Sequence, residues 1–232
     1  MTSRSIDIQS ADGKSFKGYL ALPPTGSGPG ILLIQEIFGV NSHIRAVADQ
    51  YALDGYVVLA PDVFWRQEPG LEIGYSPDDM QKGVSLMQKM DPGQAVQDLT
   101  AAVNTLRTLP ECSGKVASIG YCMGGRLAFL CAANAGVDAA VCYYPGGIDG
   151  QLAQAGKVKC PVLFHFAEKD KHISMQAVGA VREAFGGRND VAVEVYPDVD
   201  HGFNCWARAS YNQKAAALAH GRSLSLLATA IG

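Results

Sequence analysis

Short apolar runs without polar interruption recur along the chain, and segments with helical periodicity separate them. Residues 31–34, 56–60 and 139–144 are such runs. An uninterrupted apolar run of this length is typical of a strand that is buried on both faces of a parallel sheet. Because parallel neighbours need a crossover connection, the alternation of strand and helix predicts βαβ units and a mainly parallel sheet.

The same patterns place the other elements. Asn41 is a suitable N-cap for a helix that Asp54 and Gly55 would end. We expect strands at residues 15–22, 31–34, 56–60, 116–119, 139–144, 161–166 and 191–196, and helices at 41–53, at 78–109 with an interruption at 91–93, directly after residue 122, and at 211–230. No internal repeat or low-complexity linker divides the sequence. We therefore predict a single α/β domain over residues 1–232, with about eight strands and helices on both faces of the sheet.

Composition excludes several classes of protein. Hydrophobic residues make up 48% of the chain, which favours a globular protein over a disordered one. A net charge of −3 gives no attraction to nucleic acid or to an anionic membrane. The first seven residues are polar, unlike a signal peptide, and no apolar stretch approaches the ~20 residues that span a bilayer. We expect a cytoplasmic protein that binds neither nucleic acid nor membrane and, without a heptad pattern or an apolar stripe, a monomer.

Cys122 lies at the centre of the pentapeptide Gly120-Tyr121-Cys122-Met123-Gly124, between a predicted strand and a predicted helix. A Gly-x-nucleophile-x-Gly sequence in this place forms a strained turn that exposes the central side chain at the carboxyl edge of the sheet. A thiol attacks as the thiolate, so the turn predicts a cysteine nucleophile. The glycine spacing at 120–125 matches neither a dinucleotide-binding loop nor a P-loop.

The other cysteines carry weaker signals. They are scattered without a C-x-x-C pair, so we expect reduced thiols. Cys131 and Cys142 lie in apolar segments and are expected to be small buried side chains. Cys112 and Cys160 are expected to be structural, whereas Cys205 is close enough to His201 in sequence to reach a pocket.

An acid and a histidine follow the turn, each just after a predicted strand. Asp170 comes after the strand at 161–166, and His201 comes after the strand at 191–196. The carboxyl ends of parallel strands share one edge of the sheet, so both side chains are expected near Cys122. His201 would accept the thiol proton, and Asp170 would orient the imidazole. Weaker candidates for these two roles are Asp198, Asp200, His43, His165, His172 and His220.

Two motifs make the chain resemble the dienelactone hydrolase family of α/β-hydrolases. They are Gln-Glu-Ile-Phe-Gly at 35–39 and Gly-Tyr-Cys-Met-Gly-Gly at 120–125. The resemblance extends over essentially the whole chain, including Ala-Pro-Asp at 60–62, Cys-Tyr-Tyr-Pro-Gly at 142–146, and the positions of Asp170 and His201. The conjunction of the two motifs is highly specific. It implies an α/β-hydrolase fold and a Cys-Asp-His triad that hydrolyses a small lactone or carboxylic ester.

The resemblance also implies a mechanism. The Cys122 thiolate would attack the carbonyl carbon, an acyl-thioester would form, and water activated by His201 would release the acid. Glu36, from the Glu-Ile-Phe-Gly motif, would assist deprotonation of the thiol when substrate binds. The oxyanion hole would be formed by the backbone N–H groups of Ile37 and Met123. No metal or organic cofactor is implied.

One departure from the family pattern concerns the substrate. Dienelactone-cleaving members hold the substrate carboxylate with one arginine before the helix of the 80s and a second arginine four residues after the histidine. An ungapped comparison puts Met80 and Cys205 in these places, and neither side chain makes a bidentate pair with a carboxylate. Lys82 and Arg208 are the nearby cations, and Glu36 is expected to lack its resting arginine partner. The expected pocket walls, which suit an uncharged substrate as well, are Phe38, Tyr75, Met80, Met87, Phe203 and Trp206.

Three functions remain open at this point. The first is a cysteine-dependent lactone or ester hydrolase. The second is an enzyme that uses the same triad on uncharged esters, thioesters or peptide-like amides. The third is a non-hydrolytic sensor with Cys122 as a reactive thiol, but a sensor has no need for an ordered acid or for oxyanion donors.

Overall fold

The computed structural model describes residues 2–232, and its strands form one sheet in the order β1-β2-β4-β3-β5-β6-β7-β8. The strands are β1 (Thr2–Gln9), β2 (Ser15–Leu22), β3 (Gly28–Ile34), β4 (Val57–Pro61), β5 (Cys112–Tyr121), β6 (Ala139–Tyr143), β7 (Val162–Ala167) and β8 (Val191–Tyr196). β1 pairs with β2 and β2 pairs with β4 in antiparallel fashion, and the remaining pairs are parallel. The predicted mainly parallel sheet is confirmed.

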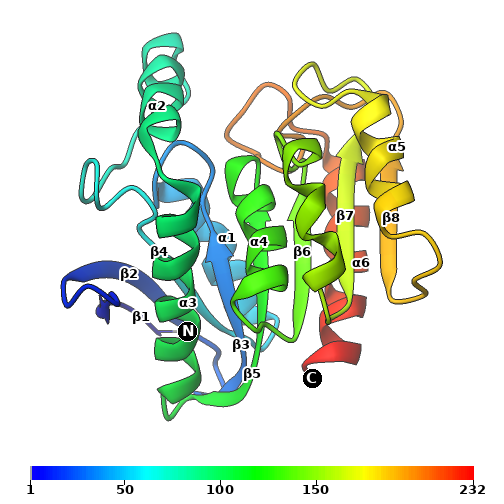
Figure 1. Ribbon diagram of the computed structural model, residues 1–232. Coiled ribbons are helices and arrows are strands. Elements are labelled where there is room, and N and C mark those ends of the chain that lie inside the picture. The colour runs from blue at the N-terminus through cyan, green and yellow to red at the C-terminus, as the bar shows by residue number, and fades with distance from the viewer. Residues whose placement is uncertain (1) are drawn as a thin grey trace.

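Helices cover both faces of this sheet. They are α1 (Ser42–Leu53), α2 (Pro77–Lys89), α3 (Pro92–Thr108), α4 (Met123–Asn134), α5 (Met175–Ala184) and α6 (Gln213–Ala230), with a 3₁₀ helix η1 (Asp149–Lys157). In Figure 1, α3, α4 and α5 lie in front of the sheet, and α1 and α6 lie behind it. This arrangement is the α/β-hydrolase fold that the resemblance implied. Asn41 caps α1 as predicted, and its side chain accepts a hydrogen bond from the N–H of Ile44 at 3.2 Å.

Three elements were not predicted: β1, η1 and α5. Strand β1 has one fully buried side chain, Ile8, so it contains no apolar run to indicate a strand. It forms because its backbone pairs with β2 along its whole length. Helix α5 begins at the N-cap Ser174, whose hydroxyl accepts from the N–H of Ala177 at 3.1 Å.

The core lies on both sides of the central strands. Ile31, Leu32, Leu33 and Ile34 of β3 are fully buried, as the continuous apolar run predicted. Burial of each such side chain contributes ~1.5–3 kcal/mol relative to an exposed one. This packing holds the carboxyl ends of β3 and β5 rigidly beside one another, since their register pairs Ile34 with Gly120.

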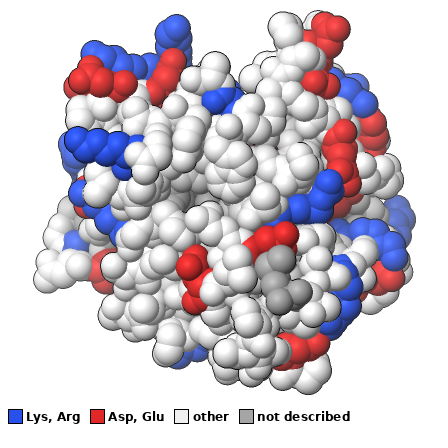
Figure 2. Space-filling view, turned by 180° about the vertical axis from the view of Figure 1, so that it is seen from behind, with Lys and Arg blue, Asp and Glu red and all other residues white. Residues whose placement is uncertain are grey.

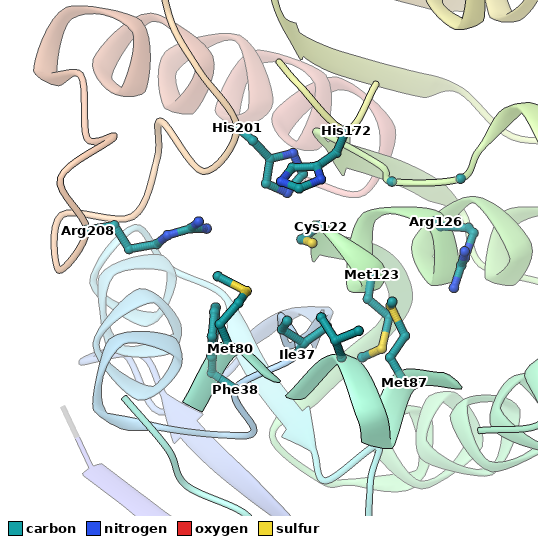
Figure 3. A pocket seen from close by; sticks show the side chains of 13 residues that line it. Ile37, Phe38, Met80, Met87, Cys122, Met123, Arg126, His172, His201 and Arg208 are labelled. Carbon is teal, nitrogen blue, oxygen red and sulfur yellow. The ribbon is translucent and has the colours of Figure 1, made fainter. Parts of the chain in front are cut away.

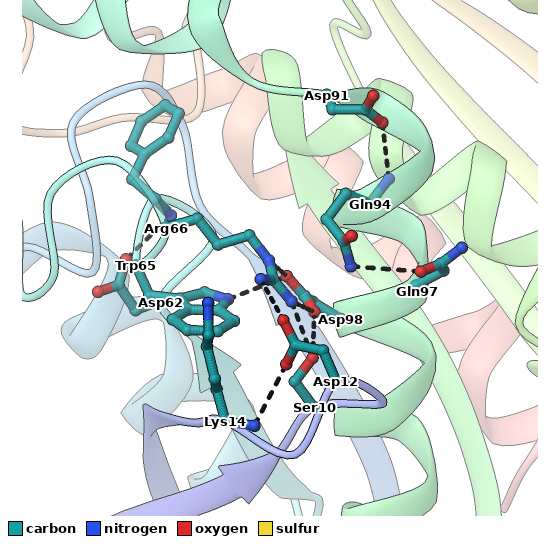
Figure 4. A network of polar contacts seen from close by, with 11 residues as sticks. Ser10, Asp12, Lys14, Asp62, Trp65, Arg66, Asp91, Gln94, Gln97 and Asp98 are labelled. Atoms are coloured by element: carbon teal, nitrogen blue, oxygen red, sulfur yellow. Dashed lines mark hydrogen bonds and ion pairs between the residues drawn. The ribbon is translucent and has the colours of Figure 1, made fainter.

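A buried carboxylate joins the N-terminal hairpin to α3 (Figure 4). Asp98 accepts hydrogen bonds from Ser10 at 2.9 Å, from the Trp65 indole at 3.0 Å and from the Arg66 guanidinium at 2.7 Å. Arg66 extends the network to Asp12, at 2.7 Å. The network therefore ties together three segments that are distant in sequence, on the opposite side of β3 from the later strands.

Figure 2 shows Lys and Arg interspersed with Asp and Glu on the face formed by α1 and α6, whose upper middle is largely uncharged. Among residues 2–232, no helix combines the length and the apolar character that crossing a membrane requires.

Candidate active site

Cys122 occupies a strained turn between β5 and α4. Its φ of 57° lies in the left-handed region, which is unfavourable for a residue with a side chain. The turn depends on glycine, because a Cβ on Gly120 would lie 1.9 Å from the carbonyl oxygen of Gly124. A Cβ on Gly124 would lie 2.3 Å from the carbonyl oxygen of Ile34. The two glycines thus let α4 approach the sheet closely enough to present a half-buried thiol at its carboxyl edge.

His201 and Asp170 are brought together by the loops after β8 and β7. The Nδ1 atom of His201 lies 2.7 Å from Oδ2 of Asp170. The other oxygen of Asp170 accepts from the backbone N–H groups of His172, at 2.8 Å, and Ile173, at 3.1 Å, and so its orientation is fixed. The ring of Tyr144 packs at 4.9 Å from the His201 ring. The imidazole is consequently held with Nδ1 toward the acid.

The charge state of His201 depends on two opposing effects. Burial disfavours the protonated ring, but the negative charge of Cys122 and the hydrogen bond to Asp170 outweigh it and raise the pKa of His201 to about 10. Cys122 and His201 line the same cavity. At neutral pH these effects favour the protonated form of the His201 ring.

Glu36 is buried behind this pair, and it has an arginine partner. Its Oε1 lies 3.4 Å from Nη1 of Arg208, whereas its Oε2 has no hydrogen-bond partner among the described residues. Burial raises the pKa of Glu36, although the charges of Arg208 and His201 work in the opposite direction. The expectation that Glu36 lacks a resting partner is wrong. Arg208 fills this place because the loop after His201 turns back toward the site, which an ungapped comparison does not reveal.

A cavity of about 330 Å³ opens beside Cys122 and His201 (Figure 3). Its walls are mostly apolar, and three predicted wall residues, Phe38, Met80 and Met87, contribute to them. The remaining lining residues are Ile37, Val84, Met123, Arg126, Gly146, Gly147, His172 and Arg208. A largely apolar cavity with a few polar groups is the usual form of a small-molecule site.

Five other predicted pocket residues do not line this cavity. Lys82 points to solvent and pairs with Glu68 at 2.7 Å. Phe203 is fully buried against the Tyr144 and Tyr196 rings. Tyr75, Cys205 and Trp206 contact other parts of the protein. The Cys205 thiol lies 3.4 Å from the Tyr75 hydroxyl, and the Trp206 ring packs on the His43 ring. For Phe203, Cys205 and Trp206, proximity in sequence to His201 was misleading, because the turns after residue 202 direct these side chains away from the cavity.

Five lining residues were missed as pocket residues: Val84, Arg126, Gly146, Gly147 and His172. Arg126 is on the first turn of α4, His172 follows Asp170, and Gly147 follows β6. The His172 ring lies 5.0 Å from the His201 ring in an edge-to-face arrangement. The position of Arg126 four residues after Cys122 was a usable signal, since a helix returns to the same face after about one turn.

Two residues with free backbone N–H groups lie on the side of Cys122 opposite His201 (Figure 3). The N–H groups of Ile37 and Met123 donate no hydrogen bond to another residue within the described chain. Both residues line the cavity. Unpaired N–H groups at a helix N-terminus are suited to bind an oxyanion.

Three buried side chains near the pocket have the residue types of a metal site. Glu36, His43 and Cys205 bring ligand atoms within 4.8 Å of one another. Such ligands suit Zn²⁺, but the Arg208 guanidinium lies 3.4 Å from Glu36 and already places a positive charge there. Burial and the charge of Arg208 lower the pKa of His43 to about 4. The cluster therefore fits polar packing around Arg208 better than a metal centre.

Comparison with known proteins shows the family of the chain. Residues 16–231 match the model of the dienelactone hydrolase family. The chain belongs to the dienelactone hydrolase family. It is 37% identical to a carboxymethylenebutenolidase of Pseudomonas putida, over 98% of this chain and 97% of the relative. It is 33% identical to carboxymethylenebutenolidase 1 of Cupriavidus pinatubonensis, with the same coverage of 98% and 97%.

Solved structures give the same result. The crystal structure of a putative dienelactone hydrolase from Klebsiella pneumoniae superimposes with a TM-score of 0.84 at 28% identity, covering 98% of this chain and 99% of that one. The family membership and the fold together make the chain a hydrolase of the lactone and ester class.

Proposed function

We propose that this dienelactone hydrolase family member cleaves a lactone or a carboxylic ester through an acyl-thioester on Cys122. His201 and Asp170 complete the catalytic triad. The observation that carries the proposal is the 2.7 Å contact between His201 and Asp170, beside a cysteine held at φ 57° on the cavity wall. A buried structural cysteine would require neither the strained turn nor the oriented imidazole.

In the first half-reaction, the Cys122 thiolate adds to the substrate carbonyl carbon. The backbone N–H groups of Ile37 and Met123 bind the oxyanion that develops. When the C–O bond breaks, the His201 imidazolium donates its proton to the leaving oxygen, and an acyl-thioester remains. In a lactone this leaving oxygen stays attached to the acyl chain.

In the second half-reaction, the neutral His201 ring accepts a proton from water. The hydroxide adds to the thioester carbonyl, the C–S bond breaks, and the carboxylic acid leaves with the Cys122 thiolate and the imidazolium restored. Asp170 keeps its carboxylate throughout, and its negative charge stabilises the imidazolium. Glu36 is the proposed acceptor of the thiol proton whenever Cys122 is protonated at the start of the cycle. Its buried position, which raises its pKa, suits this role.

The test measures initial hydrolysis rates on a dienelactone and on neutral p-nitrophenyl esters. We expect Cys122→Ala to lower kcat/KM by about 10³-fold or more, because the nucleophile is removed. Cys112→Ala is the matched control, since Cys112 is also half-buried but lies at the start of β5, outside the cavity. Mass spectrometry after rapid acid quench should detect the acyl adduct on wild-type protein only. Equal rates for wild type and Cys122→Ala would refute the proposal.

A further inference from the structure

Arg126 is a half-buried arginine with no protein partner among residues 2–232. It makes no side-chain hydrogen bond or ion pair there, although seven of the nine arginines form ion pairs. The other unpaired arginine, Arg182, is exposed to solvent, whereas Arg126 lines the reaction cavity. An unpaired charge that is partly removed from water costs free energy, so its place in this pocket calls for an anionic partner.

Its position on the helix increases this cost. Arg126 lies in the first turn of α4, where the helix dipole is positive and a cation is unfavourable. Burial lowers the pKa of Arg126, although the negative charge of Cys122 acts in the opposite direction. Its guanidinium lies against Gly147, where an added Cβ would come within 2.7 Å of Nη1. The chain thus leaves space for this group at a point where it does not improve the stability of the fold.

The two arginines of the cavity differ in their charge balance. Figure 3 shows Arg126 and Arg208 on opposite sides of Cys122. The charge of Arg208 is balanced by Glu36 at 3.4 Å, but that of Arg126 is not balanced by a carboxylate. The net positive charge of an otherwise largely apolar cavity therefore lies on the Arg126 side.

We propose that Arg126 binds a carboxylate carried by the substrate, on the side of Cys122 away from Arg208. The substrate is then an acidic ester or lactone with an apolar body between the scissile carbonyl and the charge. This inference rests on the proposed hydrolase function and adds to it a specificity residue, Arg126, which lies at neither of the two places where the dienelactone-cleaving members carry their carboxylate-binding arginines. A guanidinium pairs with a carboxylate through two parallel hydrogen bonds, so it discriminates against a neutral group of the same shape.

The test compares p-nitrophenyl hemi-esters of succinic, glutaric and adipic acids with the corresponding neutral monoamides. We expect wild type to hydrolyse at least one acid with a higher kcat/KM than its amide. The diacid with the highest kcat/KM should indicate the distance between the reacting carbonyl and Arg126. Arg126→Gln should lower kcat/KM for that acid by ~10–100-fold, the effect of losing a charge-assisted hydrogen bond, and change the amide less than twofold. Arg126→Lys should restore part of the preference. Arg182→Gln, the matched control, should leave both rates unchanged.

Two further measurements separate the possible failures. Isothermal titration calorimetry compares the binding of the acid and of the amide without turnover. It uses two proteins, the Cys122→Ala variant and the double variant Cys122→Ala, Arg126→Gln. If wild type hydrolyses no ester, the proposed function fails, and this titration still tests Arg126. If wild type hydrolyses both compounds and Arg126→Gln affects them equally, the inference about Arg126 fails alone. The melting temperature of Arg126→Gln should equal or exceed that of wild type; a clear decrease would assign Arg126 a structural role and overturn the inference.

Discussion

Glu36 is unusual among the residues of the site because one of its carboxylate oxygens is paired and the other is not. Oε1 faces Arg208, and Oε2 is buried without a partner among the described residues. A buried oxygen in this condition is costly unless it accepts a proton or a hydrogen bond at some stage. The position thus fits a group that exchanges a proton during turnover better than one that serves only to hold Arg208.

Replacing Glu36 by glutamine tests this role. We expect Glu36→Gln to lower kcat/KM by about 10²-fold or more, because an amide cannot accept the thiol proton. Pre-steady-state mixing should locate the loss in acylation, with deacylation of a preformed acyl-thioester unchanged. Urea denaturation serves as the control for stability, since the substitution leaves Arg208 without its charged partner. A normal acylation rate would mean that the Cys122–His201 pair activates the thiol alone.

Residue positions were predictable from sequence where a local pattern carried them. The turn at Cys122 is visible in its flanking glycines, and the places of Asp170 and His201 follow from the positions of two strands. The place of Arg208 was not predictable, because it depends on the path of the loop after His201. For the same reason the burial of Phe203 and Cys205 could not be inferred from their distance in sequence to His201.

At the scale of elements, the connection from β5 to α4 is the most constrained part of the molecule. Gly124→Ala would place a Cβ 2.3 Å from the carbonyl oxygen of Ile34 and 2.4 Å from that of Gln35. These are backbone atoms next to Glu36 and Ile37, so the oxyanion donors must shift along with the thiol.

We therefore expect Gly124→Ala to reduce kcat by more than 10²-fold, since misplacement by ~1 Å has effects of this size, and to reduce the free energy of unfolding by ~1–3 kcal/mol. Kinetics and urea denaturation measure the two effects. The matched control is Gly221→Ala in α6, where an added Cβ meets no atom within 4 Å. Alanine at that position should be neutral or stabilising, by up to ~1 kcal/mol. Retained activity in Gly124→Ala would show that the turn tolerates a side chain.

The network around Asp98 acts at the same scale but away from the cavity. Asp98→Asn leaves Arg66 partly buried without a full negative charge, so we expect a loss of ~3 kcal/mol in the free energy of unfolding. Asp7→Asn, which affects an exposed pair with Lys17, should cost less than ~1 kcal/mol. Urea denaturation compares the two. Hydrolysis rates should stay at the wild-type level in both, and a large loss of activity in Asp98→Asn would connect this network to the site.

Elements were predicted well where burial shapes the sequence. Residues 31–34 of β3 and the buried β4 have continuous apolar runs, and Asn41 caps α1 as predicted. Strand β1 was missed because an edge strand is specified by backbone pairing rather than by apolar side chains.

At the scale of the whole molecule, two buried histidines link stability to pH. Burial, together with nearby arginine charge, lowers the pKa of His43 to about 4 and that of His165 to about 3. In the unfolded chain both titrate near ~6.5. Between these values the unfolded state binds more protons than the folded state, so stability falls as pH falls.

Above pH ~6.5 we expect these two histidines to leave the free energy of unfolding unchanged. Below pH ~6.5 each histidine should lower the free energy of unfolding by up to ~1.4 kcal/mol per pH unit, until the pH reaches the pKa of that histidine in the folded state. Urea denaturation at intervals between pH 7 and pH 4 measures the slope. Glu36 acts in the opposite direction, because its raised pKa makes the folded state the better proton acceptor. His165→Gln should reduce the slope, and an unchanged slope in this variant would show that His165 does not contribute.

The pairing of thiol and imidazole also has a consequence for biosynthesis. Cys122 leaves the ribosome with β5, whereas His201 and Arg208 follow only after β6, β7 and β8 have been made. On the proposed mechanism, a nascent chain therefore carries its nucleophile for some time without the base that activates it or the cation that balances Glu36. The proposed catalytic set is complete only after the loop that follows β8, with His201 and Arg208, has been made.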